Sequence, residues 1–289
     1  MLRIETCQEI QSLALKYKRD GKTIALVPTM GFLHEGHLEL MRRARQKADL
    51  VIVSIFVNPI QFGPNEDLDR YPRDLDGDLK KCKAVGVDLI FTPTASELYP
   101  PGVFQTSVEV GKISQGLCGA SRPDHFKGVT TVVSKLFNLT LPDFAFFGEK
   151  DYQQLTVIKR MVADLNFPVT IIGIPIIRES DGLALSSRNA YLPAAERAEA
   201  PAIYQALNRA ADLYQRGVRE SEKLCREAME YLRKTISSPC EIEYMKICRA
   251  DDLSEINGII DGPALILTAV HLGGTRLIDN LPLERRGND

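Results

Sequence analysis

The apolar and polar positions follow two different patterns along the chain. Over roughly the first 175 residues, apolar runs of strand length alternate with stretches whose apolar residues recur at helical spacing. The run 49–57 is apolar along most of its length, as in a strand buried on both faces of a parallel sheet. The pattern predicts strands at 23–28, 49–57, 88–91, 145–147 and 170–177, and helices at 36–48, 75–85, 129–139 and 152–165.

Strands that alternate with helices predict right-handed βαβ units and hence an α/β domain with a doubly wound parallel sheet, a Rossmann-like fold. In such sheets ligands bind beyond the carboxyl ends of the strands, where the strand order reverses. Near Ile177 a polar, turn-rich segment begins. Helices are predicted after it at 194–215 and 220–236, then strands at 241–248, 264–270 and 276–278. We therefore expect a Rossmann-like domain over residues 1–177 and a smaller α+β domain over 178–289.

Composition and charge narrow the range of partners. The 36 basic and 38 acidic side chains leave a net charge of −2, which provides no field to attract a nucleic acid. The longest apolar runs, 51–57, 171–177 and 264–270, fall far short of the roughly 20 residues that span a membrane. The N-terminus lacks the pattern of a signal peptide, and no two of the six cysteines form a C-x-x-C pair. We therefore expect a cytoplasmic protein with reduced core thiols and no nucleic-acid or membrane partner.

The sharpest chemical signal is the segment 27–37, V-P-T-M-G-F-L-H-E-G-H, which ends the first buried strand and opens a helix. Helix N-termini offer backbone N–H groups and a positive dipole end, which suit phosphate. Gly31 permits a tight turn, and Gly36 lets a ligand approach the helix start. His34 and His37 are three residues apart, so both imidazoles can face the same phosphates. The alternative is a histidine pair that caps the helix or binds a metal. No dinucleotide or P-loop motif follows a predicted strand.

Two further segments carry candidate ligand-binding side chains. Asn58 and Gln61 follow the second buried strand, where neutral amides can bind a hydroxyl and a carboxylate; the alternative is capping of a turn before proline. Arg122 and His125 precede a predicted helix and can meet phosphate or carboxylate, or belong to a surface loop with a helix cap.

Two turns add positive charge and hydroxyl groups. The turn 148–151, G-E-K-D, connects a strand to a helix and carries Lys150, which acts on phosphate as a point charge. Asp151 stands where a helix cap would stand. At the expected domain junction, Ser186, Ser187 and Arg188 form a candidate anion clamp that can exclude water; an ordinary interdomain hinge is the alternative.

Together these segments resemble the pantothenate synthetases, also called pantoate–β-alanine ligases. The H-x-G-H element alone marks only a broad superfamily of nucleotidyl transferases and class I aminoacyl-tRNA synthetases, but the ordered set is much more specific and runs over essentially the whole chain. The resemblance rests on P-T-M-G-x-L-H-x-G-H at 28–37, S-I-F-V-N-P-x-Q-F at 54–62, Y-P-R at 71–73, S-R-P-x-H-F at 121–126, F-G-E-K-D-Y-Q-Q-L at 147–155, D-G-L-A-L-S-S-R-N at 181–189 and R-L-I-D-N at 276–280.

The resemblance implies an enzyme that joins (R)-pantoate to β-alanine in two half-reactions. Pantoate would attack the α-phosphorus of Mg-ATP to give pantoyl adenylate and pyrophosphate. The amine of β-alanine would then attack the acyl carbon to give pantothenate and AMP, in the pathway to coenzyme A. A homodimer is also implied, with the smaller C-terminal domain acting as a lid.

The same resemblance implies roles for individual residues. His37, His34, Lys150 and Arg188 are expected to be catalytic, with His37 as general acid. Pantoate and β-alanine would contact a set of mainly neutral side chains: Met30, Asn58, Gln61, Arg122, His125 and Gln154. ATP would contact Met30, Gly31, His34, Gly36, His37, Gly148, Glu149, Lys150, Asp151, Ile177, Leu185, Ser186, Ser187 and Arg188. Protein ligands for Mg²⁺ are not identified, since phosphates can hold the ion; Asp78 and Asp151 are the nearby candidates.

Two positions depart from the family pattern. Asp124 stands where the family commonly has Gly, so a backbone with positive φ there would be less well tolerated. Ile60 replaces a common Met, a mild apolar exchange. Two other functions fit the pattern less well. Adenylation of a phosphate-bearing acceptor would need extra cationic side chains, whereas Gln61 and Gln154 are uncharged, and the net charge of −2 disfavours nucleic-acid binding.

Overall fold

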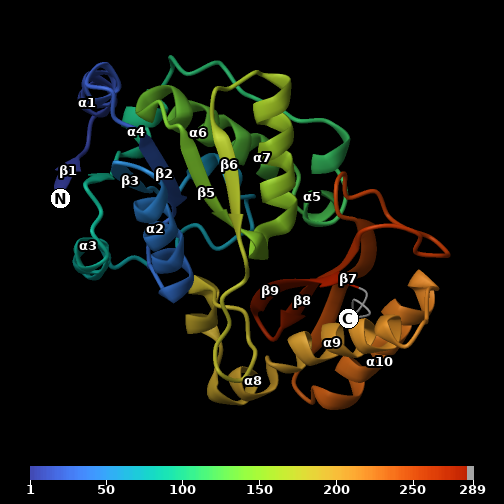
Figure 1. Ribbon diagram of the computed structural model, residues 1–289. Helices are drawn as coiled ribbons and strands as arrows, with labels where there is room; N and C mark the ends of the chain where they lie inside the picture. Colours follow the sequence, from blue (N-terminus) through green and yellow to red (C-terminus); the bar gives the residue numbers. More distant parts are fainter. Residues whose placement is uncertain (285–289) are drawn as a thin grey trace. The chain divides into compact units, whose positions relative to one another are not determined.

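The computed structural model describes residues 1–284 and divides into two compact units (Figure 1). The N-terminal unit consists of Met1–Glu149 and Gln153–Pro175. The C-terminal unit begins at Ile176 and also includes the short segment Lys150–Tyr152, which is separated from the rest of that unit in the sequence. The last five residues of the predicted domain 178–289 lie outside the described residues.

A six-stranded parallel sheet forms the centre of the N-terminal unit, with strand order β1-β4-β3-β2-β5-β6. The chain passes from β2 outward to β3 and β4, then crosses to β5 on the other side of β2, so the strand order reverses between β2 and β5. This confirms the predicted doubly wound parallel sheet. The strands are β1 (Leu2–Ile4), β2 (Ile24–Thr29), β3 (Leu50–Ile55), β4 (Leu89–Phe91), β5 (Phe144–Gly148) and β6 (Thr170–Ile174).

Helices cover both faces of this sheet and produce two separate cores. Alternate residues of a strand point to opposite faces, so Ile24 and Leu26 enter one core and Ala25 and Val27 the other. Helices α1, α6 and α7 pack on the first face, and α2 and α3 on the second. The helices of this unit are α1 (Cys7–Arg19), α2 (Glu35–Lys47), α3 (Leu75–Ala84), α4 (Ala95–Leu98), α5 (Cys118–Ser121), α6 (His125–Thr140) and α7 (Tyr152–Asp164), with 3₁₀ turns η1 (Pro59–Gln61) and η2 (Lys112–Ser114).

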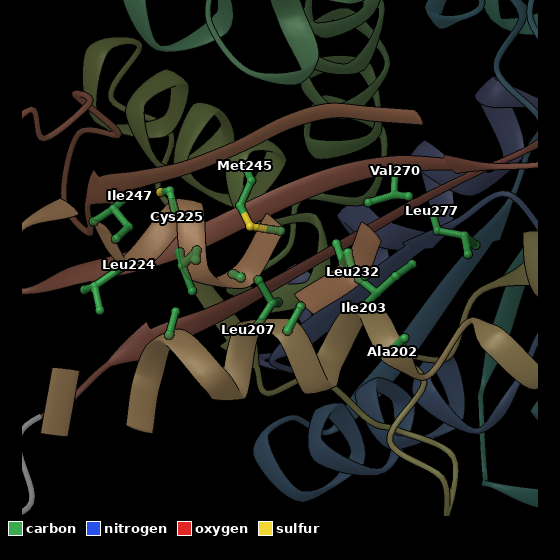
Figure 2. Close-up of a cluster of buried hydrophobic side chains, with 14 of the residues drawn as sticks. Ala202, Ile203, Leu207, Leu224, Cys225, Leu232, Met245, Ile247, Val270 and Leu277 are labelled. Atoms are coloured by element: carbon green, nitrogen blue, oxygen red, sulfur yellow. The ribbon is translucent and has the colours of Figure 1, made fainter. Parts of the chain in front are cut away.

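The C-terminal unit is an antiparallel three-stranded sheet covered by helices, which confirms the predicted smaller α+β fold. Figure 2 shows its core, in which Ile203 and Leu207 of α9 and Leu224 and Leu232 of α10 meet apolar side chains of the sheet. The elements of this unit are η4 (Ser187–Tyr191), α8 (Ala194–Glu199), α9 (Ala202–Gln215), α10 (Ser221–Thr235), β7 (Cys240–Arg249), β8 (Ala264–Leu272) and β9 (Thr275–Leu283), and η3 (Glu149–Asp151) overlaps it.

Several element boundaries differ from the sequence prediction. Helix α6 begins at His125 rather than at residue 129, so His125 lies inside the helix and not in the loop before it. The helix predicted at 194–215 is two helices, because Pro201 cannot continue the hydrogen bonding of α8. The strand predicted at 276–278 extends over Thr275–Leu283, since β9 is an edge strand and an edge tolerates Pro282.

The structure also tests the expectations of reduced core thiols and of no membrane-spanning helix. All six cysteines are free, but Cys240 is exposed and Cys7 only partly buried, so the expectation of core thiols is wrong for Cys240. Burial raises the pKa of the Cys248 thiol to about 12, which makes it a poor nucleophile. Within residues 1–284, no helix is both long and apolar enough to cross a membrane.

The core in Figure 2 gives a stability prediction. Leu207 is fully buried, so Leu207→Ala leaves a cavity and should lower the free energy of unfolding by about 2–5 kcal/mol. Ile259 of the same unit is 62% exposed, and Ile259→Ala should change the free energy by no more than about 0.5 kcal/mol. Urea unfolding followed by circular dichroism measures both variants. Equal small shifts would contradict the packing assigned to α9.

Candidate active site

The segment between β2 and α2 presents the two histidines. Gly31 has φ 83°, a conformation that favours glycine, and the chain turns there before His34, which immediately precedes α2. The His34 backbone N–H donates to Nδ1 of His37 at 3.3 Å, and the two rings lie 4.0 Å apart between centroids. Because Nδ1 of His37 accepts a hydrogen bond, the proton of the neutral ring lies on Nε2. His37 is thereby held as a donor at the start of a helix, where phosphate is favoured.

Asp78 of α3 holds the same segment from behind. Its two carboxylate oxygens accept hydrogen bonds from the backbone N–H groups of Phe32 and Leu33, both at 2.7 Å, and Lys81 Nζ donates to the Leu33 carbonyl at 2.7 Å. Asp78 is 1% exposed, and burial raises the pKa of its carboxyl despite the two backbone donors. Both carboxylate oxygens accept a main-chain hydrogen bond, so Asp78 supports this loop, and a contact between Asp78 and Mg²⁺ stays a prediction.

Met30, Asn58 and Gln61 come together at the carboxyl ends of β2 and β3. Gln61 Nε2 lies 3.2 Å from Sδ of Met30, and Gln61 Oε1 accepts a hydrogen bond from Asn58 Nδ2 at 3.0 Å. Asn58 Nδ2 also donates to the Gly128 carbonyl at 3.1 Å, and Asn58 Oδ1 accepts from the Tyr99 hydroxyl at 2.9 Å. The Asn58 amide therefore bonds to protein groups and orients Gln61, whereas the Gln61 amide nitrogen faces the Met30 side chain.

Arg122 and His125 form a second chain of hydrogen bonds that ends on Gln61. Arg122 pairs with both carboxylate oxygens of Glu66 and its NH1 group lies 3.1 Å from His125 Nε2. His125 Nδ1 lies 2.8 Å from the Gln61 carbonyl oxygen. Burial acts to raise the pKa of Glu66, but its bonds to Arg122 outweigh burial and hold that pKa below its usual value. A charged Glu66 thus anchors Arg122, and a substrate contact for Arg122 or His125 stays a prediction.

Asp124 connects these two residues through a left-handed turn. Its φ is 62°, so the position where the family commonly has Gly does require a positive φ. Asp enters this region more readily than most side chains. The chain accommodates the departure, because His125 reaches Gln61 and Arg122 reaches Glu66 with Asp124 in place.

The turn after β5 divides between the two units. Gly148 ends β5 in the N-terminal unit, and a Cβ added there would meet no atom within 4 Å. Glu149 packs over Gly173, where a Cβ would come within 2.8 Å of its carboxylate. Lys150 and Asp151 belong to the C-terminal unit and form an ion pair at 3.6 Å.

The two neighbouring glutamines of α7 have different environments. Gln153 is buried, and its amide bonds to the main chain at Cys118, Ile113 and Gly116. Gln154 is half-buried and makes no side-chain hydrogen bond within residues 1–284. Gln153 is therefore structural, and Gln154 is the glutamine of this pair that is available to a ligand.

In the C-terminal unit, the predicted clamp follows a short hairpin. Leu185 N–H donates to the Ile177 carbonyl at 3.0 Å, which brings these two predicted ATP contacts side by side. Ser186 Oγ accepts from the Arg188 N–H at 3.3 Å, and Ser187 is buried at the start of η4. The three clamp residues thus lie in one turn of the chain whose geometry is set by its own hydrogen bonds.

Comparison with known proteins identifies the family. A family model described as pantoate-beta-alanine ligase matches residues 3–282. The chain belongs to the pantoate–β-alanine ligase family. The pantothenate synthetase of Pelobacter propionicus is 53% identical over 275 residues, covering 95% of each chain. The pantothenate synthetase of Moorella thermoacetica is 53% identical over 283 residues, covering 97% of this chain and 98% of that one.

Solved structures of pantoate–β-alanine ligases have the same fold as this chain. The ligase of Thermus thermophilus has a TM-score of 0.91 and 43% identity, covering 98% of this chain and 99% of its own. The ligase of Francisella tularensis, complexed with β-γ ATP and β-alanine, has a TM-score of 0.81 and 33% identity, covering 99% of each chain.

Within this family member, sequence reasoning missed the residues that hold the candidate site in shape. Glu66 and Tyr99 stand in no predicted site, yet they anchor Arg122 and Asn58. Asp279 and Asn280 lie in the R-L-I-D-N motif, for which no role was predicted. The motif itself could have pointed to Asp279 and Asn280. No local pattern could have pointed to Glu66 or Tyr99, because their partners Arg122 and Asn58 are 56 and 41 residues away in the sequence.

Gly128 offers a test of how Gln61 is positioned. A Cβ at Gly128 would lie 2.5 Å from the Ile60 carbonyl oxygen and 2.6 Å from Gln61 Cα, so Gly128→Ala must displace the Gln61 turn. If Gln61 binds the acid as the sequence predicts, Gly128→Ala should weaken that binding by about 1–3 kcal/mol, a size typical of overpacking. Isothermal titration calorimetry with pantoate as probe measures this loss. Gly116→Ala is the control, since a Cβ there meets nothing within 4 Å. Equal affinities in both variants would contradict the role of Gly128.

Proposed function

We propose that this chain condenses (R)-pantoate with β-alanine at the expense of ATP, giving pantothenate, AMP and pyrophosphate through a pantoyl adenylate. The observation that carries the proposal is the contact between Gln61 and Met30, a neutral amide beside an apolar wall, with Met30 only four residues before His34 at the helix start. A neutral amide binds a hydroxy acid without neutralising its carboxylate, which must remain the nucleophile. The full-length family match supports the same reaction.

The ATP phosphates are assigned to the start of α2. The helix dipole at the start of α2 and the Nε2 proton of His37 both favour negative charge there. His37 would donate to the phosphoryl oxygens as charge develops on them, and His34 would contact the same phosphates. We also assign Lys150, Ser186, Ser187 and Arg188 to phosphate, and Gly31, Gly148, Glu149, Asp151, Ile177 and Leu185 to contacts with ATP.

In the first half-reaction, a pantoate carboxylate oxygen bonds to the α-phosphorus while the bond from that phosphorus to the bridging oxygen of pyrophosphate breaks. Gln61 and Gln154 would orient pantoate against Met30, so most of the rate would come from alignment. In the second half-reaction, the neutral amine of β-alanine bonds to the acyl carbon, the bond from that carbon to the AMP oxygen breaks, and the nitrogen loses one proton to solvent. Arg122 and His125 are assigned to the substrate side of the site, beside the Gln61 backbone they contact.

Magnesium is assigned to ATP as its counter-ion. Within residues 1–284, no three His, Cys, Asp or Glu side chains gather as a metal site. This fits an ion whose ligands are mainly phosphate oxygens and water, as Mg²⁺ prefers. When bound, the ion would neutralise charge on the departing pyrophosphate.

We further infer a cytoplasmic homodimer whose residues 1–177 bind ATP and pantoate and whose residues 178–289 form the lid domain. The family resemblance supports the dimer and the lid. The balanced charge and the reduced cysteines support a cytoplasmic location. Sedimentation equilibrium tests the dimer directly.

Isotope exchange between pyrophosphate and ATP tests the proposed reaction. Adenylate formation is reversible and precedes the attack of β-alanine. Exchange should therefore require pantoate and ATP but no β-alanine. The measurement is incorporation of labelled pyrophosphate into ATP with each component omitted in turn. Exchange that starts only with a different acid would overturn the substrate assignment.

His37 should matter to chemistry more than to folding. In His37→Ala the Nε2 donor is lost, so single-turnover formation of pantoyl adenylate should slow by about 10²- to 10³-fold with little change in the melting temperature. His271→Ala is the control, because His271 pairs with Glu243 in the C-terminal sheet and has no assigned role in the reaction. An unchanged adenylation rate in His37→Ala would remove this residue from the mechanism.

A further inference from the structure

The lysine turn belongs to the C-terminal unit although the sequence places it between β5 and α7. Residues Lys150–Tyr152 group with that unit. Two side-chain to main-chain hydrogen bonds attach them to it. Asn280 Nδ2 donates to the Lys150 carbonyl at 3.0 Å, and the Tyr152 hydroxyl donates to the Ala250 carbonyl at 3.1 Å. The main chain that carries Lys150 is therefore positioned by β9 and by the segment after β7.

Asp279, the residue before Asn280, binds Arg178 in the segment that leads to the Ser186–Arg188 clamp. Asp279 is 4% exposed and accepts hydrogen bonds from both terminal nitrogens of Arg178, at 2.7 and 2.8 Å, and from the Asn280 backbone N–H at 2.7 Å. Arg178 also donates to the Gly182 carbonyl at 3.1 Å, and its guanidinium stacks on the Tyr204 ring at 3.7 Å. Arg178 thereby closes the hairpin that leads directly into Ser186.

Two consecutive residues of β9 thus bind two segments that lie far apart in the sequence. Asn280 is 130 residues from Lys150, and Asp279 is 101 residues from Arg178. A buried ion pair is by itself weak evidence about stability, since desolvation offsets much of its attraction. The adjacency of Asp279 and Asn280 is the informative feature, because one rigid strand sets the spacing between the Lys150 turn and the Ser186–Arg188 turn.

We propose that Asp279 and Asn280 are positioning residues that hold Lys150 and the Ser186–Arg188 clamp in one fixed arrangement for the triphosphate. This rests on the proposed function, which assigns both segments to phosphate. Neither residue touches a reacting atom in this scheme. Their effect passes through Lys150 and the clamp, whose cations must be in place before charge develops on the phosphorus oxygens.

The test removes the hydrogen bond from Asn280 and leaves Lys150 intact. In Asn280→Ala the turnover for pantoate-dependent pyrophosphate exchange should fall by about 10- to 100-fold, while the KM for pantoate stays within about twofold. Asn208→Ala is the matched control: Asn208 Nδ2 also donates to a main-chain carbonyl, that of Tyr204 at 3.0 Å, but in α9. Its exchange rate should remain within about twofold of the unsubstituted chain.

A double substitution separates positioning from general weakening. If Asn280 acts through Lys150, then Asn280→Ala should cause almost no further loss in a Lys150→Ala background. Losses that multiply in the double variant would overturn the proposal, as would an Asn280→Ala rate equal to that of the Asn208 control. If circular dichroism shows that Asn280→Ala does not fold, Asn280→Asp replaces it in the same experiment. Asp keeps the shape of the Asn side chain but lacks the amide N–H donor.

The failure of the proposed function would look different. Exchange that is absent or independent of pantoate in the unsubstituted chain would overturn the proposed function itself. Pantoate-dependent exchange that Lys150→Ala leaves unchanged would overturn only the positioning proposal, because Asn280 would then have no catalytic lysine to hold.

Discussion

The central position of β2 in the parallel sheet is the constraint on which the rest of the N-terminal unit depends. β2 pairs with β3 along its whole length and with β5 on its other side, so the carboxyl ends of three strands from distant parts of the sequence meet. Met30 and Gly31 leave β2, Asn58 follows β3, and Gly148 ends β5. The strand order reverses at the β2–β5 pair, where open parallel sheets bind ligands.

Buried and partly buried polar residues next to the site fix the positions of its side chains. Asp78 fixes the Phe32–Leu33 main chain, and the chain from Glu66 through Arg122 to His125 reaches the Gln61 carbonyl. Each of these groups has a specific hydrogen-bond partner, as polar groups withdrawn from water require. The histidines and Gln61 are consequently presented by rigid elements rather than by free loops, which favours catalysis through alignment.

In the C-terminal unit, too, polar side chains on a rigid sheet hold the segments that carry candidate site residues. Its apolar core between α9, α10 and the sheet provides a rigid base. On that base, Asp279 and Asn280 attach the Arg178 hairpin and the Lys150 turn to one edge strand. The grouping of Lys150 with this unit was not evident from the sequence, which runs without interruption from Gly148 at the end of β5 into α7.

The sequence by itself determined the α/β class, the order of most strands and helices, and the residue types that suit an ATP-dependent ligase. These follow from local signals: apolar periodicity, glycines at turns, and histidines at a helix start. It misplaced the start of α6, which begins at His125 and includes Gly128, where the Gln61 turn packed against the helix requires glycine. It did not show that Asp78 supports the main chain before α2, and it gave no role to Glu66, Tyr99 or Asn280. Only the tertiary structure decided those, because each acts through a hydrogen bond to a residue at least 41 positions away, and chain folding alone determines which distant groups meet.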